Sequence, residues 1–145
     1  MSVHQAHVVY RVPYADTDQM GVVYYANYLI YFEMLRNQLL RDLALPYSEL
    51  ERRGYALPVI EANVQYKAAA RYDDEIDVYG WLAWVRGVRL RVDCEVRCRE
   101  ALLARGYTVH ACVDRQTLRP VRVLPELAAC EAAGVPDAEP NSEGK

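Results

Sequence analysis

The stretch YADTDQMGVVYYANY, residues 14–28, holds the residue types whose spacing best suits catalysis in this chain. Asp16 and Asp18 flank a threonine, Gly21 follows, and an apolar, tyrosine-rich run begins at Val22. A carboxylate can act as a base or a nucleophile, and the free N–H groups at the start of a helix can stabilise a negatively charged oxygen. Together these groups suit attack on a polarised carbonyl carbon.

The rest of the chain narrows the kind of carbonyl compound. It contains neither a serine-elbow motif nor a cysteine nucleophile motif. The four cysteines have neither CxxC nor zinc-ligand spacing, so we expect structural thiols, no metal and no cofactor. A carboxylate that acts without such groups needs a substrate with a good leaving group, and a thioester is the simplest choice.

A second interpretation of the two aspartates stays open. Aspartate is a favoured helix N-cap, and a negative charge near a helix N-terminus contributes about 0.3–1 kcal/mol. However, Asp16 and Asp18 precede Tyr24 by more residues than a cap needs. Gly21, which lies between Asp18 and Tyr24, indicates a sharp turn there. Asp16 by itself is expected to accept hydrogen bonds within the loop rather than to be a second catalytic group.

One long helix should follow this motif, because residues 24–43 contain neither glycine nor proline. Residues 24–35 are apolar on nearly every side, so the helix should be buried. After Gly54 the apolar residues recur with a period of two, which is typical of strands. We expect strands near residues 5–13, 56–69, 74–86, 88–100 and 103–116.

The alternation also predicts which side chains face the core. Apolar and charged residues alternate without exception over residues 88–99, which predicts a solvated face that carries Arg89, Arg91, Arg97 and Arg99. In residues 107–114 the alternation puts Tyr107, Val109, Ala111 and Val113 on the apolar face, opposite Thr108, His110, Cys112 and Asp114. His110 is therefore expected at the surface or at an interface, and Cys112 is expected to point outward.

The order of these elements indicates an α+β domain over residues 1–125, in which a curved antiparallel sheet wraps one long helix. A single sheet leaves edges and one open face, which favours self-association. Residues 126–145 should form a short helix and then a flexible tail, because their end is polar and contains proline.

Charge and hydropathy exclude several kinds of partner. The 145 residues include 17 Lys and Arg against 20 Asp and Glu, and the net charge of −3 does not favour nucleic acid or an anionic membrane. The longest nearly apolar run, residues 22–32, is too short for a bilayer, which takes about 20 residues. Residues 1–14 show no secretory signal pattern, so we expect a cytoplasmic protein without membrane insertion.

Residues 14–28 resemble the signature D-x-D-x-x-G-V-V-Y-x-x-N-Y of the hotdog-fold acyl-CoA thioesterases of the 4-hydroxybenzoyl-CoA thioesterase and YbgC type. The similarity continues in LPVIEANVQYKAAARYDDEIDV and in GYTVHACVD, and it covers about residues 7–125. The resemblance implies a hotdog fold with a five-stranded antiparallel sheet around one central helix. It also implies homodimers with one continuous sheet, often paired into homotetramers, and active sites at the dimer interface.

The same resemblance assigns roles to single residues. Asp18 matches the catalytic aspartate and would act as nucleophile or general base, while the backbone N–H of Tyr25 would polarise the thioester carbonyl. The expected substrate contacts are Gly21, Val22, Tyr24, Asn27, Asn63 and Gln65. Asn27 would either close the helix start or meet the partner subunit. Asn63 with Gln65 would either face the acyl group across the dimer or be ordinary polar residues of a strand face.

The resemblance also bears on the substrate. Many YbgC-like sequences carry histidine at the position of Tyr25, whereas the aromatic-acyl branch carries tyrosine, so a short-chain or aromatic acyl-CoA is expected. One or more of the strand arginines could hold a phosphate of CoA. The alternatives are an acyl-carrier-protein thioesterase and a non-catalytic acyl-CoA-binding module, and the intact Asp18 disfavours the second.

Overall fold

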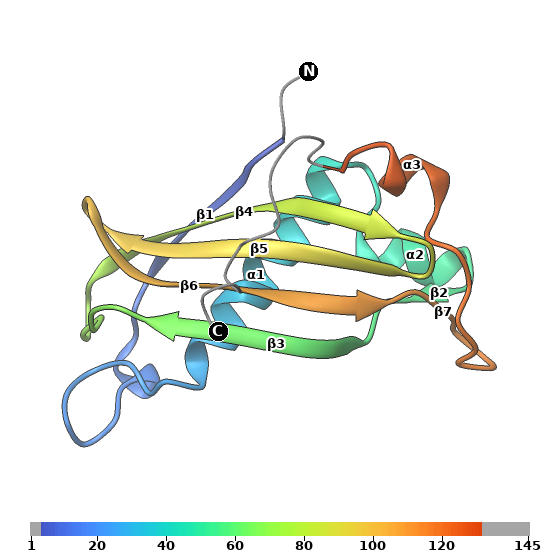
Figure 1. Cartoon of the computed structure of the whole chain (residues 1–145). Helices are drawn as coiled ribbons and strands as arrows, with labels where there is room; N and C mark the ends of the chain where they lie inside the picture. Colours follow the sequence, from blue (N-terminus) through green and yellow to red (C-terminus); the bar gives the residue numbers. More distant parts are fainter. Residues whose placement is uncertain (1–3, 132–145) are drawn as a thin grey trace.

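A computed structural model describes residues 4–131 as one antiparallel sheet with a long helix against one face (Figure 1). The sheet, in spatial order, consists of β1 (Ala6–Arg11), β4 (Glu75–Arg86), β5 (Arg89–Cys98), β6 (Ala101–Ala111) and β3 (Val59–Tyr66). The other elements are the 3-10 turn η1 (Tyr14–Asp16), the helices α1 (Asn27–Asp42), α2 (Tyr47–Arg52) and α3 (Pro125–Ala128), and the strand pair β2 (Tyr55–Ala56) and β7 (Val113–Asp114).

This architecture confirms the predicted α+β class and the hotdog arrangement of a five-stranded antiparallel sheet around one long helix. Several predicted boundaries differ. The predicted strand near residues 103–116 is divided, because β6 ends at Ala111 and the separate strand β7 pairs with β2. Strand β6 begins at Ala101, before the predicted residue 103. Helix α1 begins at Asn27 rather than at Tyr24, because the preceding residues form a tighter turn in which the N–H of Asn27 donates to the carbonyl of Tyr24 at 2.9 Å.

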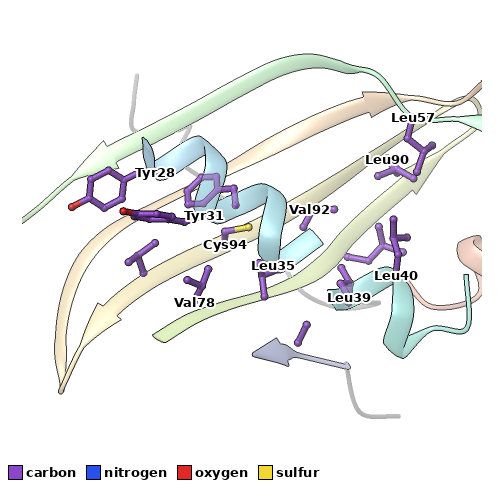
Figure 2. Close-up of a cluster of buried hydrophobic side chains, with 14 of the residues drawn as sticks. Tyr28, Tyr31, Leu35, Leu39, Leu40, Leu57, Val78, Leu90, Val92 and Cys94 are labelled. Atoms are coloured by element: carbon purple, nitrogen blue, oxygen red, sulfur yellow. The ribbon is translucent and has the colours of Figure 1, made fainter. Parts of the chain in front are cut away.

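The core lies between α1 and the sheet (Figure 2). Tyr28, Tyr31, Leu35 and Leu39 recur at helical spacing and are buried against strand residues such as Val78, Val92 and Cys94. Burial of one such side chain contributes about 1.5–3 kcal/mol. The opposite side of α1 is not covered, because Leu29 and Ile30 are exposed in the single chain.

Gly80 marks a point of close approach between α1 and β4. A Cβ atom there would collide with the side chain of Leu35 and with the main-chain oxygen of Asp93. The helix can therefore lie directly on the sheet only because residue 80 has no side chain. This close approach fixes the depth of α1, and so the position of its N-terminus relative to the strand ends.

The predicted orientation of β6 is wrong. Leu90 and Val92 of β5 pair with His110 and Thr108, so the two β6 residues share the core-facing side of the sheet. His110 is fully buried instead of lying at the surface, and Cys112 is buried instead of pointing outward. Both alternating sets of this strand contain apolar residues, so the pairing with β5, which the local pattern does not contain, decides the orientation.

His110 is accommodated in the core by hydrogen bonds on both ring nitrogens. Its Nδ1 lies 2.9 Å from the carbonyl oxygen of Leu57, and its Nε2 lies 2.9 Å from Oγ1 of Thr108. A carbonyl can only accept, so Nδ1 carries the proton and Nε2 accepts from the threonine hydroxyl. The neutral imidazole is thereby fully paired.

We expect this histidine to make the fold sensitive to acid. Burial and, to a smaller extent, the positive charge of Arg36 lower the pKa of His110 from 6.5 to about 4, although the bond to Leu57 opposes the shift. Since the folded pKa lies below the unfolded one, stability is complete above about pH 6.5 and falls towards pH 4, by a contribution on the order of 3 kcal/mol. Urea unfolding between these pH values should show a shallower pH dependence for His110→Asn, and an unchanged dependence would contradict the assignment.

Arg91 also departs from the prediction of a solvated arginine face. Its side chain is 10% exposed, its Nε donates to Oδ1 of Asp93 at 2.6 Å, and its guanidinium lies 3.8 Å from the ring centre of Tyr107. Arginine stacks on aromatic rings in this way more readily than lysine. Arg89 and Arg99 are exposed as predicted.

The C-terminal part of the described chain belongs to the same core. Leu127 of α3 is buried with Leu124 against the core residues. Of the predicted C-terminal segment, residues 126–145, only residues 126–131 are described. The predicted end of the domain at residue 125 stays a prediction. No helix within residues 4–131 is long and apolar enough to cross a membrane.

Candidate active site

A small closed loop presents the carboxylate of Asp18. Thr17 and Val23 form an antiparallel bridge, and the N–H of Asp18 donates to the carbonyl of Val22 at 2.9 Å. The N–H of Gly21 returns to the carbonyl of Asp18 at 2.9 Å, and this turn requires the positive φ of 81° that glycine adopts readily. The aspartate therefore occupies a fixed place at the start of a tight turn.

The carboxylate of Asp18 keeps one oxygen available. Its Oδ1 accepts from the N–H of Met20 at 2.8 Å, within its own loop. Its Oδ2 accepts no hydrogen bond from the described residues 4–131, and the residue is only half-buried. The side chain is thus oriented by one bond and retains a free oxygen that can contact water or substrate.

Asp16 fastens this loop to the sheet and to the helix. Its Oδ2 accepts from the hydroxyls of Tyr10 at 3.0 Å and Tyr31 at 2.7 Å. Its carbonyl oxygen accepts from the N–H of Tyr24 and from the side-chain amide of Asn27. Asp16 is therefore a hydrogen-bond acceptor in the loop, as predicted, and Asn27 closes the start of the helix, which is one of the two roles left open for it.

The phenols that bind Asp16 remain donors. Burial, followed by the hydrogen bond to the Asp16 carboxylate, raises the pKa of both Tyr10 and Tyr31 above the ordinary value for tyrosine. Both hydroxyls consequently stay protonated at neutral pH and continue to donate to the carboxylate. The loop is held by charge-assisted hydrogen bonds, which are stronger than bonds between neutral groups.

The N-terminus of α1 has no side-chain cap. No side chain of residues 4–131 accepts a bond as the cap of this helix, and the N–H groups of Tyr25 and Ala26 donate to no described acceptor. The interpretation of either aspartate as the helix cap is therefore wrong. Bare N–H groups and the positive end of the helix dipole leave this terminus ready to bind a negatively charged oxygen.

Tyrosine rings form one wall of this region. Tyr24 and Tyr25 lie 4.9 Å apart by ring centres, and Tyr66 of β3 meets Tyr25 edge-on at 6.3 Å and Tyr28 at 5.3 Å. The pKa of the Tyr24 phenol is raised, first by its hydrogen bond with Tyr25 and also by the nearby charge of Asp18. Asp18 and this tyrosine wall therefore belong to the same region of the surface.

Two predicted substrate residues are not brought to this region within one chain. Asn63 and Gln65 pair with Tyr107 and Arg105 of β6, on the sheet face opposite α1. The remaining predicted residues, Gly21, Val22, Tyr24 and Asn27, all lie within the loop or the helix start. A contact of Asn63 and Gln65 with substrate across a dimer stays a prediction.

The residues that sequence reasoning missed are tyrosines. Tyr10 and Tyr31 bind Asp16, and the hydroxyl of Tyr66 donates to the carbonyl oxygen of Tyr25 at 3.0 Å. Alternation over residues 60–67 groups Tyr66 with the apolar Ile60, Ala62 and Val64 on one strand face. It does not distinguish a core aromatic residue from one that reaches a residue 41 positions away. The local sequence holds no signal for these contacts.

Together the loop and the helix start can attack and stabilise a carbonyl group. Asp18 supplies a free carboxylate oxygen, and the N–H groups of Tyr25 and Ala26 supply donors for the oxygen that becomes negatively charged. The described residues near this site include no cysteine, since all four are free thiols elsewhere in the fold and Cys94 and Cys112 are buried.

Comparison with known proteins agrees with this chemistry. The model of the thioesterase-like superfamily matches residues 12–130. The chain is 32% identical to YneP of Bacillus subtilis, over 83% of this chain and 88% of that protein. It is 33% identical to the acyl-CoA thioester hydrolase YbgC of Escherichia coli, over 83% and 90% of the two chains.

A solved structure shows the same architecture over nearly the whole chain. The DHNA-CoA thioesterase from Staphylococcus aureus superposes with a TM-score of 0.82 at 28% identity, over 97% of this chain and 95% of that one. The sequence match, the shared fold and the carboxylate beside a bare helix N-terminus agree with one another. The chain belongs to the thioesterase-like superfamily and is a thioester hydrolase.

Proposed function

We propose that this protein hydrolyses acyl-CoA to a free acid and CoA, with Asp18 as the reacting carboxylate. The observation that carries the proposal is the free Oδ2 of Asp18 beside an uncapped helix start. The substrate carbonyl oxygen would accept from the N–H of Tyr25, and the positive end of the helix dipole would favour the charge that develops on it.

Two routes fit this arrangement. In the first, Asp18 attacks the carbonyl carbon, the C–S bond breaks to release CoA thiolate, and water then hydrolyses the resulting mixed anhydride. In the second, Asp18 takes a proton from water while the water oxygen attacks, and the thiolate leaves from the same tetrahedral intermediate. Both routes need the same carboxylate and the same N–H donors.

The acyl group is proposed to be short or aromatic. The rings of Tyr24, Tyr25 and Tyr66 are exposed beside the site, and flat aromatic surfaces pack well against an aromatic acyl group. The tyrosine at position 25, where many relatives of the YbgC type carry histidine, supports the same preference. We further propose that the enzyme acts in the cytoplasm.

The working unit is proposed to be a homodimer that pairs through β3, with a dimer of dimers as its larger form. Strand β3 is one edge of the sheet, and residues 59–63 are exposed on both faces. Its apolar Val59 and Ile60 are uncovered, as are Leu29 and Ile30 on the neighbouring helix. An unpaired apolar edge of this kind favours pairing with a second copy.

A panel of thioesters tests the proposed function. Acetyl-, hexanoyl- and benzoyl-CoA, with the same acyl groups on acyl carrier protein, would be compared by direct detection of the released thiol. We expect hydrolysis of the CoA esters, and the greatest kcat/KM for short or aromatic acyl groups. Hydrolysis of the carrier-protein esters alone would replace CoA as the substrate class, and binding without thiol release would contradict catalysis.

A further inference from the structure

We propose that the hydroxyl of Tyr66 is a positioning group for catalysis, because it holds the backbone turn that presents the carbonyl-binding N–H groups. This inference rests on the proposed function of the site. Tyr66 is the last residue of the edge strand β3, and the turn that it contacts precedes α1 by only a few residues.

The turn depends on few contacts. The residue Tyr25 is 61% exposed, and neither Tyr24 nor Ala26 is buried, so core packing does not hold this segment. The carbonyl of Tyr25 accepts a local bond from the N–H of Tyr28 at 3.2 Å. Within the described part of the chain, the bond of 3.0 Å from the Tyr66 hydroxyl is the one tertiary hydrogen bond to this carbonyl.

This bond completes the anchoring of the two peptide planes beside Tyr25, because it acts on the plane after that residue. The plane before it is anchored because the carbonyl of Tyr24 accepts from Asn27 at 2.9 Å, and the plane after it is anchored by Tyr66 and Tyr28. With both planes held, the N–H groups of Tyr25 and Ala26 each have one direction, and the bond from Tyr66 acts on that of Ala26. A donor that is oriented before the reaction stabilises a developing negative charge without further reorganisation.

The same bond also acts on Ala26. The carbonyl of Tyr25 and the N–H of Ala26 belong to one peptide group, so a bond to the carbonyl polarises that N–H and makes it a better donor. The hydroxyl is suited to this task, because burial, and then the neighbouring Tyr25, raise the pKa of Tyr66 and keep its phenol protonated. The ring of Tyr66 is held by its contacts with Tyr25 and Tyr28.

Tyr66→Phe tests this inference, since it removes only the hydroxyl and keeps the ring contacts. A hydrogen bond contributes about 1 kcal/mol net, so we expect kcat for benzoyl-CoA to fall by roughly three- to tenfold. KM, the unfolding temperature and the oligomeric state should stay as in the parent. A role in stability alone would lower the unfolding temperature and leave kcat unchanged, which would overturn the inference.

Tyr79→Phe is the matched control. Tyr79 lies on the face of the sheet opposite α1, where it stacks on His7 with ring centres 4.5 Å apart. Removal of its hydroxyl should leave kcat unchanged. An equal loss of kcat in both variants would show a general effect of tyrosine removal and would overturn the assignment to Tyr66.

Infrared spectroscopy gives a readout of carbonyl polarisation that does not depend on turnover. Benzoyl-CoA bound to Asp18→Asn should show a carbonyl stretch lowered from its value in solution, and the double variant Asp18→Asn with Tyr66→Phe should show a smaller lowering. Equal stretches would overturn the inference. A parent enzyme that hydrolyses acyl-CoA, with kcat unaffected by Tyr66→Phe, would overturn the role of Tyr66 alone, whereas an inactive parent would overturn the proposed function and this inference together.

Discussion

Asp18→Asn should abolish most of the turnover while it leaves the fold intact. The amide can still accept from the N–H of Met20, so the loop should keep its shape. It can neither attack a carbonyl nor take a proton, and loss of such a group lowers the rate by roughly 10²–10⁴ or more. Steady-state kinetics should place the loss in kcat, with the substrate affinity and the unfolding temperature near those of the parent.

Asp16→Asn is the control for this substitution. The amide oxygen retains two lone pairs and can still accept from Tyr10 and Tyr31, although without the strength that the charge provides. We therefore expect a far smaller loss of kcat than for Asp18→Asn. Near-parental hydrolysis by the Asp18 variant, or a greater loss from the Asp16 variant, would remove Asp18 from the reaction.

Ile60→Asp should convert the proposed dimer into an inactive monomer. Ile60 is 49% exposed in the single chain and lies on the edge strand β3, where the second copy is proposed to pair. An unpaired carboxylate buried in an interface costs several kcal/mol, and each 1.4 kcal/mol weakens association about tenfold. Light scattering should give twice the 16.6 kDa chain mass for a parental dimer, or four times for the dimer of dimers, and the single mass for the variant.

The activity of this variant should fall with its association. Tyr25 and Tyr66 are exposed at the end of β3, so the site of a single chain is open on the side where the partner would lie. We expect less than about a hundredth of the parental kcat/KM, a loss of about 2.7 kcal/mol in transition-state stabilisation. A parent enzyme that is a folded, active monomer would contradict the proposed shared site.

Val9→Asp provides the matched control on the other edge of the sheet. Val9 is 53% exposed and lies on β1, so the substitution introduces the same charge at a similar exposure. The variant should remain dimeric and active. If Val9→Asp separates the subunits and Ile60→Asp does not, pairing takes place through β1 and the proposed position of the interface is wrong.

The local pattern of the sequence was sufficient for the elements of this fold. Strict alternation over residues 88–99 predicted β5, and the absence of glycine and proline after Tyr24 predicted α1. Periodicity works here because it depends only on neighbours along one chain segment. The D-x-D motif likewise pointed to the loop of Asp18, since a carboxylate, a glycine turn and a helix start all lie within a few residues.

Orientation and contacts between distant segments required the tertiary structure. The buried face of β6 is set by its pairing with β5, in which His110 lies opposite Leu90. Likewise, the choice between helix cap and free carboxylate depended on which donor Asp18 meets, and that donor is Met20 in its own loop.

The residues that hold the loop and the turn could not be predicted from the sequence pattern for the same reason. Tyr31 reaches Asp16 across 15 positions, and Tyr66 reaches Tyr25 across 41. A hydrogen bond between such distant residues leaves no periodic trace in the sequence, because it exists only after the helix has docked on the sheet. The sequence by itself therefore determined the elements and predicted the reacting carboxylate, whereas the packing of α1 against the strands decided which side chains contact the backbone beside it.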